Sequence, residues 1–252
     1  MITREELERV AKLKGLTLEN CEKDYFQDIV LLTIYKEVRR EFVFKGGTCL
    51  YKVYKLNRFS EDLDFTISKK AKADKILQSI LYSVKSLNIG VIVKDYSQFQ
   101  KQVNIRLAFR GPLYKGNKES MLMILLNLSS REKQVLEPRK ELIVPMYSDL
   151  PTFEVYAMDE NEIVIEKIIT IMERNKPRDV YDLWFLLKVK GLKVDTRLLS
   201  NKFGELDLND FMKKVDEKTE GWERELGRFV IGSLPPFSQV KKEIKEKMEG
   251  IK

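Results

Sequence analysis

The aspartates Asp62 and Asp64 are separated by a single residue in the run EDLDF. On a β-strand, residues two positions apart point to the same face, so the two carboxylates would lie side by side while Leu63 and Phe65 enter the core. Adjacent like charges are costly unless a cation lies between them, and a divalent metal ion is the usual cation. The pair therefore predicts a metal site, for Mg²⁺ or Mn²⁺.

A glycine pair precedes these aspartates. Gly46 and Gly47 follow the apolar run FVF, and the run TCLYKVYKL predicts a helix that begins near Thr48. Glycine lets the backbone approach a phosphate closely, and a helix N-terminus presents unpaired amides to it. A turn explains the glycine pair alone, and the polar face of a strand explains Asp-x-Asp alone. Together and in this order, they favour a site that holds a triphosphate against a metal ion.

Cations near these motifs would balance the phosphate charge. The candidates are Lys45, Lys52 and Arg58, with Arg178 further along the chain. Arg178 and Asp179 begin a predicted helix, and the helix dipole favours an aspartate there, so we expect Asp179 to be structural.

A lysine interrupts an apolar helix face in the second part of the chain. Lys167 lies four residues from both Ile163 and Ile171, so it shares their face of the helix. Such a lysine either extends its amine to the surface or is a desolvated functional group, and the pattern alone favours the first. Asp182 in the next helix could contact Lys167. Such a contact would be either a structural ion pair or part of a functional site.

The composition restricts the chemistry. The chain has 252 residues and a formal net charge of +7, which favours a nucleotide or polyanion as partner. It contains no histidine, which excludes Ser-His-Asp and Cys-His nucleophile chemistry. Its two cysteines make no disulfide framework, and no apolar run is long enough to span a membrane. The charged N-terminus lacks a secretory signal, so we expect a cytoplasmic protein.

The elements that must position these residues follow from periodicity. An α+β domain is expected over 1–155 and a helical domain over 156–252, because strand-like patterns end near residue 155. Helices are predicted after Thr3, over 18–40, from Thr48, and over 72–86, 159–175, 177–191, 196–203, 207–230 (with a break around Gly221) and 237–248. Strands are predicted at 42–44, 61–67, 89–96, 102–111 and 120–130.

These motifs carry a family resemblance. The run KGGTCLYKVYKLNRFSEDLDF, from Lys45 to Phe65, resembles the signature of the AbiEii-type nucleotidyltransferases. These are toxins of abortive-infection and type IV toxin–antitoxin systems, within the polymerase-beta-like nucleotidyltransferase superfamily. The runs EKDYFQDIVLL and EKIITIMERNKPRDVYDLWFLL also resemble that family, so the similarity extends from about Glu22 to Leu187.

The resemblance implies a mixed or antiparallel sheet flanked by helices, followed by a helical domain that contributes to the active site. It implies Mg²⁺-dependent transfer of a nucleotide from an NTP, with release of pyrophosphate. It also implies a toxin that blocks translation, with the tRNA acceptor end as target and a cognate antitoxin as partner. The implied roles are metal binding by Asp62 and Asp64, triphosphate binding by Gly46, Gly47 and Thr48, charge neutralisation by Lys167, and orientation of Lys167 by Asp182.

One position departs from the superfamily pattern. A third acidic residue often lies on a neighbouring strand, and Asn127 occupies the matching place here. An amide is a poorer metal ligand and cannot act as a base. Either Glu132 or another carboxylate replaces it, or the acceptor needs no strong base, or the activity is weak or lost. Two alternatives therefore stay open: a housekeeping or small-molecule nucleotidyltransferase, and a non-catalytic nucleotide- or RNA-binding module.

Overall fold

The computed structural model describes residues 1–68, 72–131 and 134–249, and the chain forms two compact units. The first unit consists of Met1–Val53, Phe59–Gln134 and Pro138–Ala157, and the second of Tyr54–Arg58, Val135–Glu137 and Met158–Lys252. Two short segments before Met158 therefore belong to the second unit, and from Met158 onward the chain belongs to it throughout. Among the helices in the described ranges, none combines the length and the apolar character that a membrane crossing needs.

The first unit is built on a seven-stranded mixed sheet with the order β3-β4-β5-β2-β1-β7-β6. The pairs β2–β5 and β1–β7 are parallel, and the other neighbouring pairs are antiparallel. This arrangement confirms the predicted mixed sheet flanked by helices. The strands are β1 (Phe42–Lys45), β2 (Leu63–Ile67), β3 (Val91–Phe99), β4 (Gln102–Phe109), β5 (Leu122–Ser129), β6 (Arg139–Ile143) and β7 (Phe153–Ala157).

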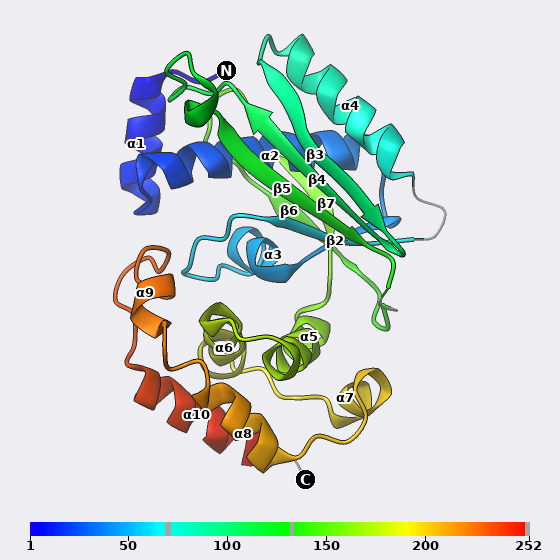
Figure 1. Ribbon diagram of the computed structural model, residues 1–252, viewed down its shortest axis with the longest axis vertical. Helices are drawn as coiled ribbons and strands as arrows, with labels where there is room; N and C mark the ends of the chain where they lie inside the picture. The colour runs from blue at the N-terminus through cyan, green and yellow to red at the C-terminus, as the bar shows by residue number, and fades with distance from the viewer. Residues whose placement is uncertain (69–71, 132–133, 250–252) are drawn as a thin grey trace. The chain divides into compact units, whose positions relative to one another are not determined.

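In the described residues, four α-helices and one 3₁₀ helix accompany the sheet: α1 (Arg4–Lys14), α2 (Leu18–Glu37), α3 (Gly46–Lys52), α4 (Ala73–Ser86) and η1 (Lys118–Ser120). The hydroxyls of Thr3 and Thr17 accept hydrogen bonds from backbone amides at the starts of α1 and α2, as N-caps do. Helices α2 and α4 cover one face of the sheet (Figure 1). That face carries the alternating apolar residues of β4, such as Ile105 and Leu107, which are fully buried. The opposite face of β4 is polar, as the alternation predicts.

The second unit is helical. Its elements are α5 (Glu160–Glu173), α6 (Pro177–Trp184), a π-helical turn η2 (Phe185–Val189), α7 (Thr196–Lys202), α8 (Leu208–Asp216), α9 (Trp222–Leu226) and α10 (Phe237–Glu249). The carboxylate of Glu162 on α5 accepts hydrogen bonds from the backbone amides of Val135 and Leu136, at 2.9 and 2.8 Å. Asn57 accepts a backbone hydrogen bond of 2.8 Å from Ile231. These bonds explain why two short segments that interrupt the first unit belong to the second.

Several predicted boundaries were wrong. Helix α3 begins at Gly46, two residues early, because that glycine adopts a φ of +74° and turns the chain directly into the helix. Strand β2 begins at Leu63, so Asp62 precedes the strand instead of lying within it. The strands β6 and β7 were not predicted. The break predicted around Gly221 is confirmed, because α8 ends at Asp216 and α9 begins at Trp222 with Gly221 as its N-cap.

Candidate functional site

A row of polar residues crosses four adjacent strands of the first unit. Lys45 on β1 lies opposite Asp64 on β2, Asp64 opposite Asn127 on β5, and Asn127 opposite Asn104 on β4. Residues directly opposite one another in a sheet point to the same face. All four are half-buried, and they alternate with core residues along their strands. The row therefore lies on the sheet face that α2 and α4 do not cover.

The carboxylate of Asp64 packs against the backbone of Gly46. A Cβ added at Gly46 would lie 2.5 Å from Oδ2 of Asp64, and Gly46 has a φ of +74°. Both the close approach and the left-handed backbone require glycine at this position. The glycine turn and the second aspartate of EDLDF are thus parts of one site.

The other oxygen of Asp64 is held by an amide. Nδ2 of Asn127 donates a hydrogen bond of 2.8 Å to Oδ1 of Asp64. Asn127 therefore lies where a third carboxylate was looked for, and it orients Asp64 instead of adding a charge to the site. Glu132, the alternative third carboxylate, falls outside the described residues.

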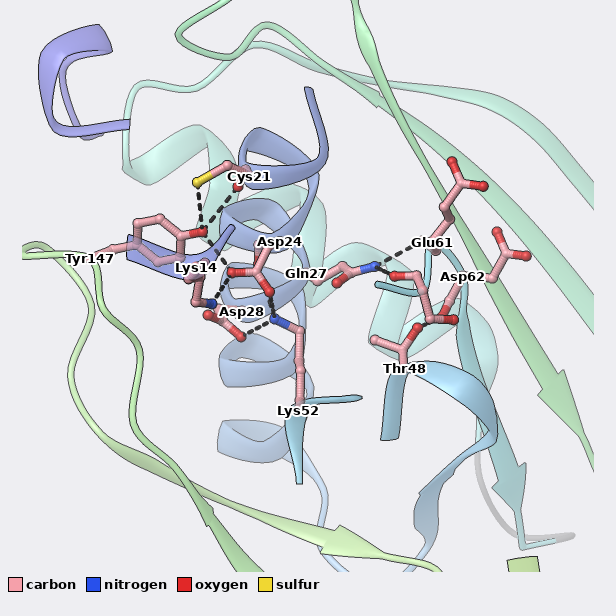
Figure 2. A network of polar contacts seen from close by, with 11 residues as sticks. Lys14, Cys21, Asp24, Gln27, Asp28, Thr48, Lys52, Glu61, Asp62 and Tyr147 are labelled. Atoms are coloured by element: carbon pink, nitrogen blue, oxygen red, sulfur yellow. Dashed lines mark hydrogen bonds and ion pairs between the residues drawn. The ribbon is translucent and has the colours of Figure 1, made fainter. Parts of the chain in front are cut away.

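Three consecutive carbonyl groups before β2 are held by buried side chains. Nε2 of Gln27 donates hydrogen bonds of 2.9 Å to the carbonyl oxygens of both Ser60 and Glu61. The hydroxyl of Thr48 donates to the carbonyl oxygen of Asp62 (Figure 2). The side chain of Thr48 is fully buried and used inside the fold, so only its backbone amide is left for the phosphate role that the sequence predicted. Helices α2 and α3 together fix the segment that delivers Asp62.

Lys52 lies at the end of α3 and points into a buried network on α2 (Figure 2). Its Nζ donates to Oδ1 of Asp24 at 2.8 Å, to the carbonyl oxygen of Asp24 at 3.1 Å and to Oδ1 of Asp28 at 2.7 Å. An ammonium group has three donors, and these three acceptors use all of them. The phosphate-binding role predicted for Lys52 is therefore replaced by a role inside the fold, where it fastens α3 to α2.

The same network contains further charges. Lys14 pairs with Asp24, and the hydroxyl of Tyr147 donates to Oδ2 of Asp24 at 2.6 Å. Burial alone would raise the pKa of Asp24, but Lys52 and Lys14 hold it well below its usual range. Burial, opposed by Lys52 and reinforced by the charge of Asp24, raises the pKa of Asp28 to about 6. Burial would lower the pKa of Lys52, but the two aspartates raise it.

Sequence reasoning missed these residues of α2. A signal for them existed, because Asp24, Gln27 and Asp28 are three and four residues apart and share one face of a helix that is otherwise largely apolar. All three are buried, at 0%, 0% and 2% exposure. Polar residues buried on one face must have partners, and here the partners are α3 and the segment before Asp62.

The second unit contains a separate buried ion cluster. Nζ of Lys167 lies 2.9 Å from Asp179 and 2.7 Å from Asp182. The guanidinium of Arg58 donates to both oxygens of Asp182, at 2.9 and 2.8 Å, and Arg174 binds Asp179 in the same two-pronged manner, at 2.8 and 3.0 Å. Lys167 is only 6% exposed, so it does not extend to the surface.

The electrostatics of this cluster follow from its pairing. Burial would lower the pKa of Lys167, but Asp179 and Asp182 raise it. Burial would raise the pKa of Asp179, but Lys167 and Arg174 hold it below its usual range. Lys167 therefore stays charged. The structure brings Lys167 and Asp182 together as predicted and adds Asp179 and Arg58, while Arg178 lies half-buried in the first turn of α6.

The donor set near Asp64 suits a small hard cation. The described part of the chain has no group of three or more His, Cys, Asp or Glu side chains that could hold a metal ion. Mg²⁺ needs fewer protein ligands than that, because it is usually bound through one or two carboxylates together with substrate phosphates and water. Asp62 and Asp64 were predicted to be such a pair, and Gly46 has no side chain that would meet the carboxylate of Asp64.

Comparisons with known proteins identify a family and a shared fold. The family model described as "Nucleotidyl transferase AbiEii toxin, Type IV TA system" matches residues 31–243. JHP933 from Helicobacter pylori has a TM-score of 0.61 and 21% identity, over 93% of this chain and 92% of that chain. A nucleotidyltransferase structure from H. pylori has the same TM-score and identity, over 93% and 95% of the two chains.

MenT4, a nucleotidyltransferase toxin from Mycobacterium tuberculosis H37Rv, has a TM-score of 0.63 and 16% identity, over 98% of this chain and 88% of that chain. At these identities the three solved structures establish the shared fold. No curated protein matches the chain in sequence.

Proposed function

Since the chain belongs to the AbiEii family of nucleotidyltransferase toxins, we propose that it transfers a nucleotide from an NTP to the acceptor end of a tRNA. A nucleotide added there would prevent aminoacylation and so block translation. The nucleotidyltransferase activity is a property of the family, whereas the RNA acceptor and the use of Mg²⁺ belong to this proposal.

The observation that carries the proposal is the setting of Asp64. One carboxylate oxygen packs against the backbone of Gly46, where a Cβ would lie 2.5 Å away, and the other accepts a hydrogen bond of 2.8 Å from Asn127. A carboxylate held at two points beside a glycine turn is preorganised, and preorganised charge is the main source of catalysis in phosphoryl transfer.

Each residue has a distinct task in this proposal. The backbone at Gly46, Gly47 and Thr48 binds the triphosphate, and Lys45, opposite Asp64 on the next strand, lies beside it. Asp62 and Asp64 hold Mg²⁺. The bound ion would neutralise phosphate charge and polarise the phosphate that is attacked.

The second unit supplies cations. We propose that Lys167 stabilises the charge that develops on the triphosphate, and that Asp182 orients Lys167, from which it lies 2.7 Å away. Arg58 was predicted to bind phosphate directly. Its two hydrogen bonds to Asp182 favour an indirect role, in which it fixes the carboxylate that orients Lys167.

The proposed reaction does not require Asn127 to act as a base for the attacking hydroxyl. The side chain of Asn127 cannot take a proton at neutral pH. In phosphoryl transfer the protein contributes mainly by positioning the reactants and stabilising charge, with little covalent chemistry of its own. The site therefore depends on position and electrostatics more than on proton removal.

The family also indicates a cognate antitoxin as partner. Expression of the wild-type protein in bacteria should arrest growth, and Asp62→Ala should not. Equal harmlessness of the two proteins, in a host whose tRNAs are accepted in vitro, would favour a housekeeping enzyme.

The test of the reaction is direct. The protein is incubated with each α-labelled NTP, Mg²⁺ and total tRNA, and the label is followed on denaturing gels. We expect the label on tRNA, with release of pyrophosphate, and no label with Asp64→Asn. Label on a small molecule or on protein, and none on tRNA in the presence of all four NTPs, would refute the RNA acceptor.

A further inference from the structure

The sheet itself indicates the side from which the acceptor approaches. In nucleotidyl transfer the attacking and leaving oxygens lie roughly in line on opposite sides of the α-phosphate. In the proposed function the glycine turn binds the triphosphate, and because this turn follows β1, the leaving pyrophosphate would lie on the β1 side of Asp64. The attacking hydroxyl must then come from the other side of β2, over β5, β4 and β3.

That side of the sheet continues the polar row. From Asp64 the register leads to Asn127 on β5, Asn104 on β4 and Ser97 on β3. Adjacent strands are about 4.8 Å apart, so three strand spacings extend about 14 Å from the carboxylate. A path of this length accommodates about two nucleotides of an extended strand.

Side-chain amides along this path are oriented by their neighbours. Nε2 of Gln102 donates to Oδ1 of Asn104 at 2.9 Å, and Nδ2 of Asn127 donates to Asp64 at 2.8 Å. These bonds leave Nδ2 of Asn104 as a donor and Oδ1 of Asn127 as an acceptor. A donor and an acceptor with set directions can bind the edges of unpaired bases.

A cation and an aromatic ring flank the amides. Arg106 on β4 is exposed and lies on the same face as Asn104. Its register partner is Asp95, yet Arg106 makes no ion pair with any residue in the ranges 1–68, 72–131 and 134–249. Phe99, opposite Gln102 at the end of β3, is 67% exposed. Arg106 lies two residues after Asn104 on β4, and Phe99 lies opposite Gln102, two residues before it, so the guanidinium and the ring are on either side of Asn104. An exposed ring and a cation on one surface are the groups that bind single-stranded nucleic acid, by stacking and by phosphate contact.

We propose that this surface, formed by Asn127, Asn104, Gln102, Arg106 and Phe99, binds the unpaired 3′ end of the RNA acceptor. The inference rests on the proposed function, because it assumes an RNA acceptor. Three properties select that occupant: continuity with Asp64, an unpaired cation for phosphate, and an exposed ring for a base. The polar row begins at Asp64, where the reacting 3′ end must lie. The terminal nucleotide would therefore lie over Asn127, and the preceding nucleotide toward Phe99.

The test compares two tRNA transcripts with a 5′ fluorescein, one complete and one without the unpaired 3′ tail. Their affinities for the full-length protein are measured by anisotropy in EDTA, which prevents turnover. Phe99→Ala removes one stacking contact with a base and is expected to weaken binding roughly 5- to 100-fold. Arg106→Gln removes one phosphate contact and is expected to lower the slope of log affinity against log salt concentration by about one unit. Both effects should be confined to the transcript with the tail.

Matched controls come from α4, on the opposite face of the same sheet. Tyr82→Ala removes a ring that is 77% exposed, and Lys85→Gln removes an exposed cation. Neither should change the affinity for either transcript. All four changes lie on the surface, and thermal unfolding together with binding of a fluorescent NTP shows whether each variant keeps the fold and the nucleotide site.

The outcomes separate the two proposals. Suppose that the wild type labels tRNA, and that Phe99→Ala and Arg106→Gln bind the tailed transcript with the same affinity as the wild type. The acceptor then uses another surface, and this inference is wrong. If the wild type labels no tRNA, the proposed function is wrong and this inference falls with it. If only these two variants bind the tailed transcript more weakly, and their NTP binding is unchanged, the result supports both the RNA acceptor and this binding surface.

Discussion

The side-chain amide of Asn127 donates a hydrogen bond of 2.8 Å to the carboxylate of Asp64, across the parallel pair β2–β5. This bond stands where related enzymes often place a third carboxylate. It fixes the carboxylate of Asp64, which we propose binds Mg²⁺ together with Asp62 in a site with two negative charges instead of three.

The variant Asn127→Asp tests this relationship. The change removes the donor and places a like charge beside Asp64, so the metal-free protein should lose about 1 kcal/mol of stability near neutral pH. Mg²⁺ should restore more stability to the variant than to the wild type, because the added charge attracts the ion. Thermal unfolding in EDTA and in Mg²⁺ measures both effects. Equal melting temperatures for the two proteins in both conditions would show that Asn127 does not contact the ion site.

Gly46→Ala should damage the site through a clash and not only through backbone strain. A left-handed backbone at alanine costs about 1–2 kcal/mol, and the added Cβ would lie 2.5 Å from Asp64. Gly116→Ala is the matched control, because Gly116 has a φ of +88° and nothing within 4 Å of an added Cβ. Both variants should lose similar stability from strain. Only Gly46→Ala should lose affinity for NTP, which isothermal titration calorimetry measures. Equal affinities of the two variants would mean that the glycine turn takes no part in NTP binding.

Asp28 should make the stability depend on pH between about 4 and 6. Its folded pKa is raised to about 6 from an ordinary value of 3.8, so the folded protein holds a proton there that the unfolded chain has already lost. Stability therefore falls as pH rises through this window, by about 2–3 kcal/mol in total. Asp24 does not interfere, because its pKa is lowered and its effect lies at lower pH.

The comparison is urea unfolding of the wild type and Asp28→Asn at pH 4 and pH 7. Asparagine keeps an acceptor for Lys52 but has no proton to lose. The stability of Asp28→Asn relative to the wild type should rise from pH 4 to pH 7. A constant difference between the two proteins would mean that Asp28 is ionised throughout.

Lys167→Met should reduce both stability and rate. The amine is buried between Asp179 and Asp182, and removing one partner of such a group costs about 3–5 kcal/mol. If Lys167 also faces the triphosphate, the rate should fall on the order of 10²–10³-fold at a temperature where the variant is folded. The control is Lys202→Met, which removes a lysine 2.7 Å from the buried Glu162 in the same unit. Equal rates for the two variants would restrict Lys167 to a structural role.

The sequence predicted the central parts of the fold because their patterns are local. The alternation of Val103, Ile105, Leu107 and Phe109 identifies β4, and these residues are buried as expected. Strands β6 and β7 were missed although they pair with each other over five residues each, and β7 joins the sheet by pairing with β1, which is distant in the sequence. The mixed order of the sheet depends on such long-range pairing, which no local pattern reveals.

The site shows the same division. The metal-binding pair indicated by the spacing of Asp62 and Asp64 stays a prediction, whereas Lys167 and Asp182 lie together as predicted from two helices. The assignment of Lys52 failed because its partners, Asp24 and Asp28, lie on a helix that precedes it by more than twenty residues. Proximity to a motif in sequence suggested a phosphate ligand, and only the packing of α3 on α2 shows that the amine points the other way.

The most direct test of the central claim is the variant Asp64→Asn, followed by two readouts on the same sample. We propose that Asp64 and Asp62 bind Mg²⁺ for nucleotide transfer. Transfer from NTP to tRNA should therefore fall by at least about 10²-fold, while the melting temperature in EDTA stays unchanged or rises, because one of two adjacent charges is removed. Mg²⁺ should no longer shift that melting temperature. Retained transfer, or a large loss of stability in the metal-free variant, would contradict the account and make the pair a structural feature of the sheet.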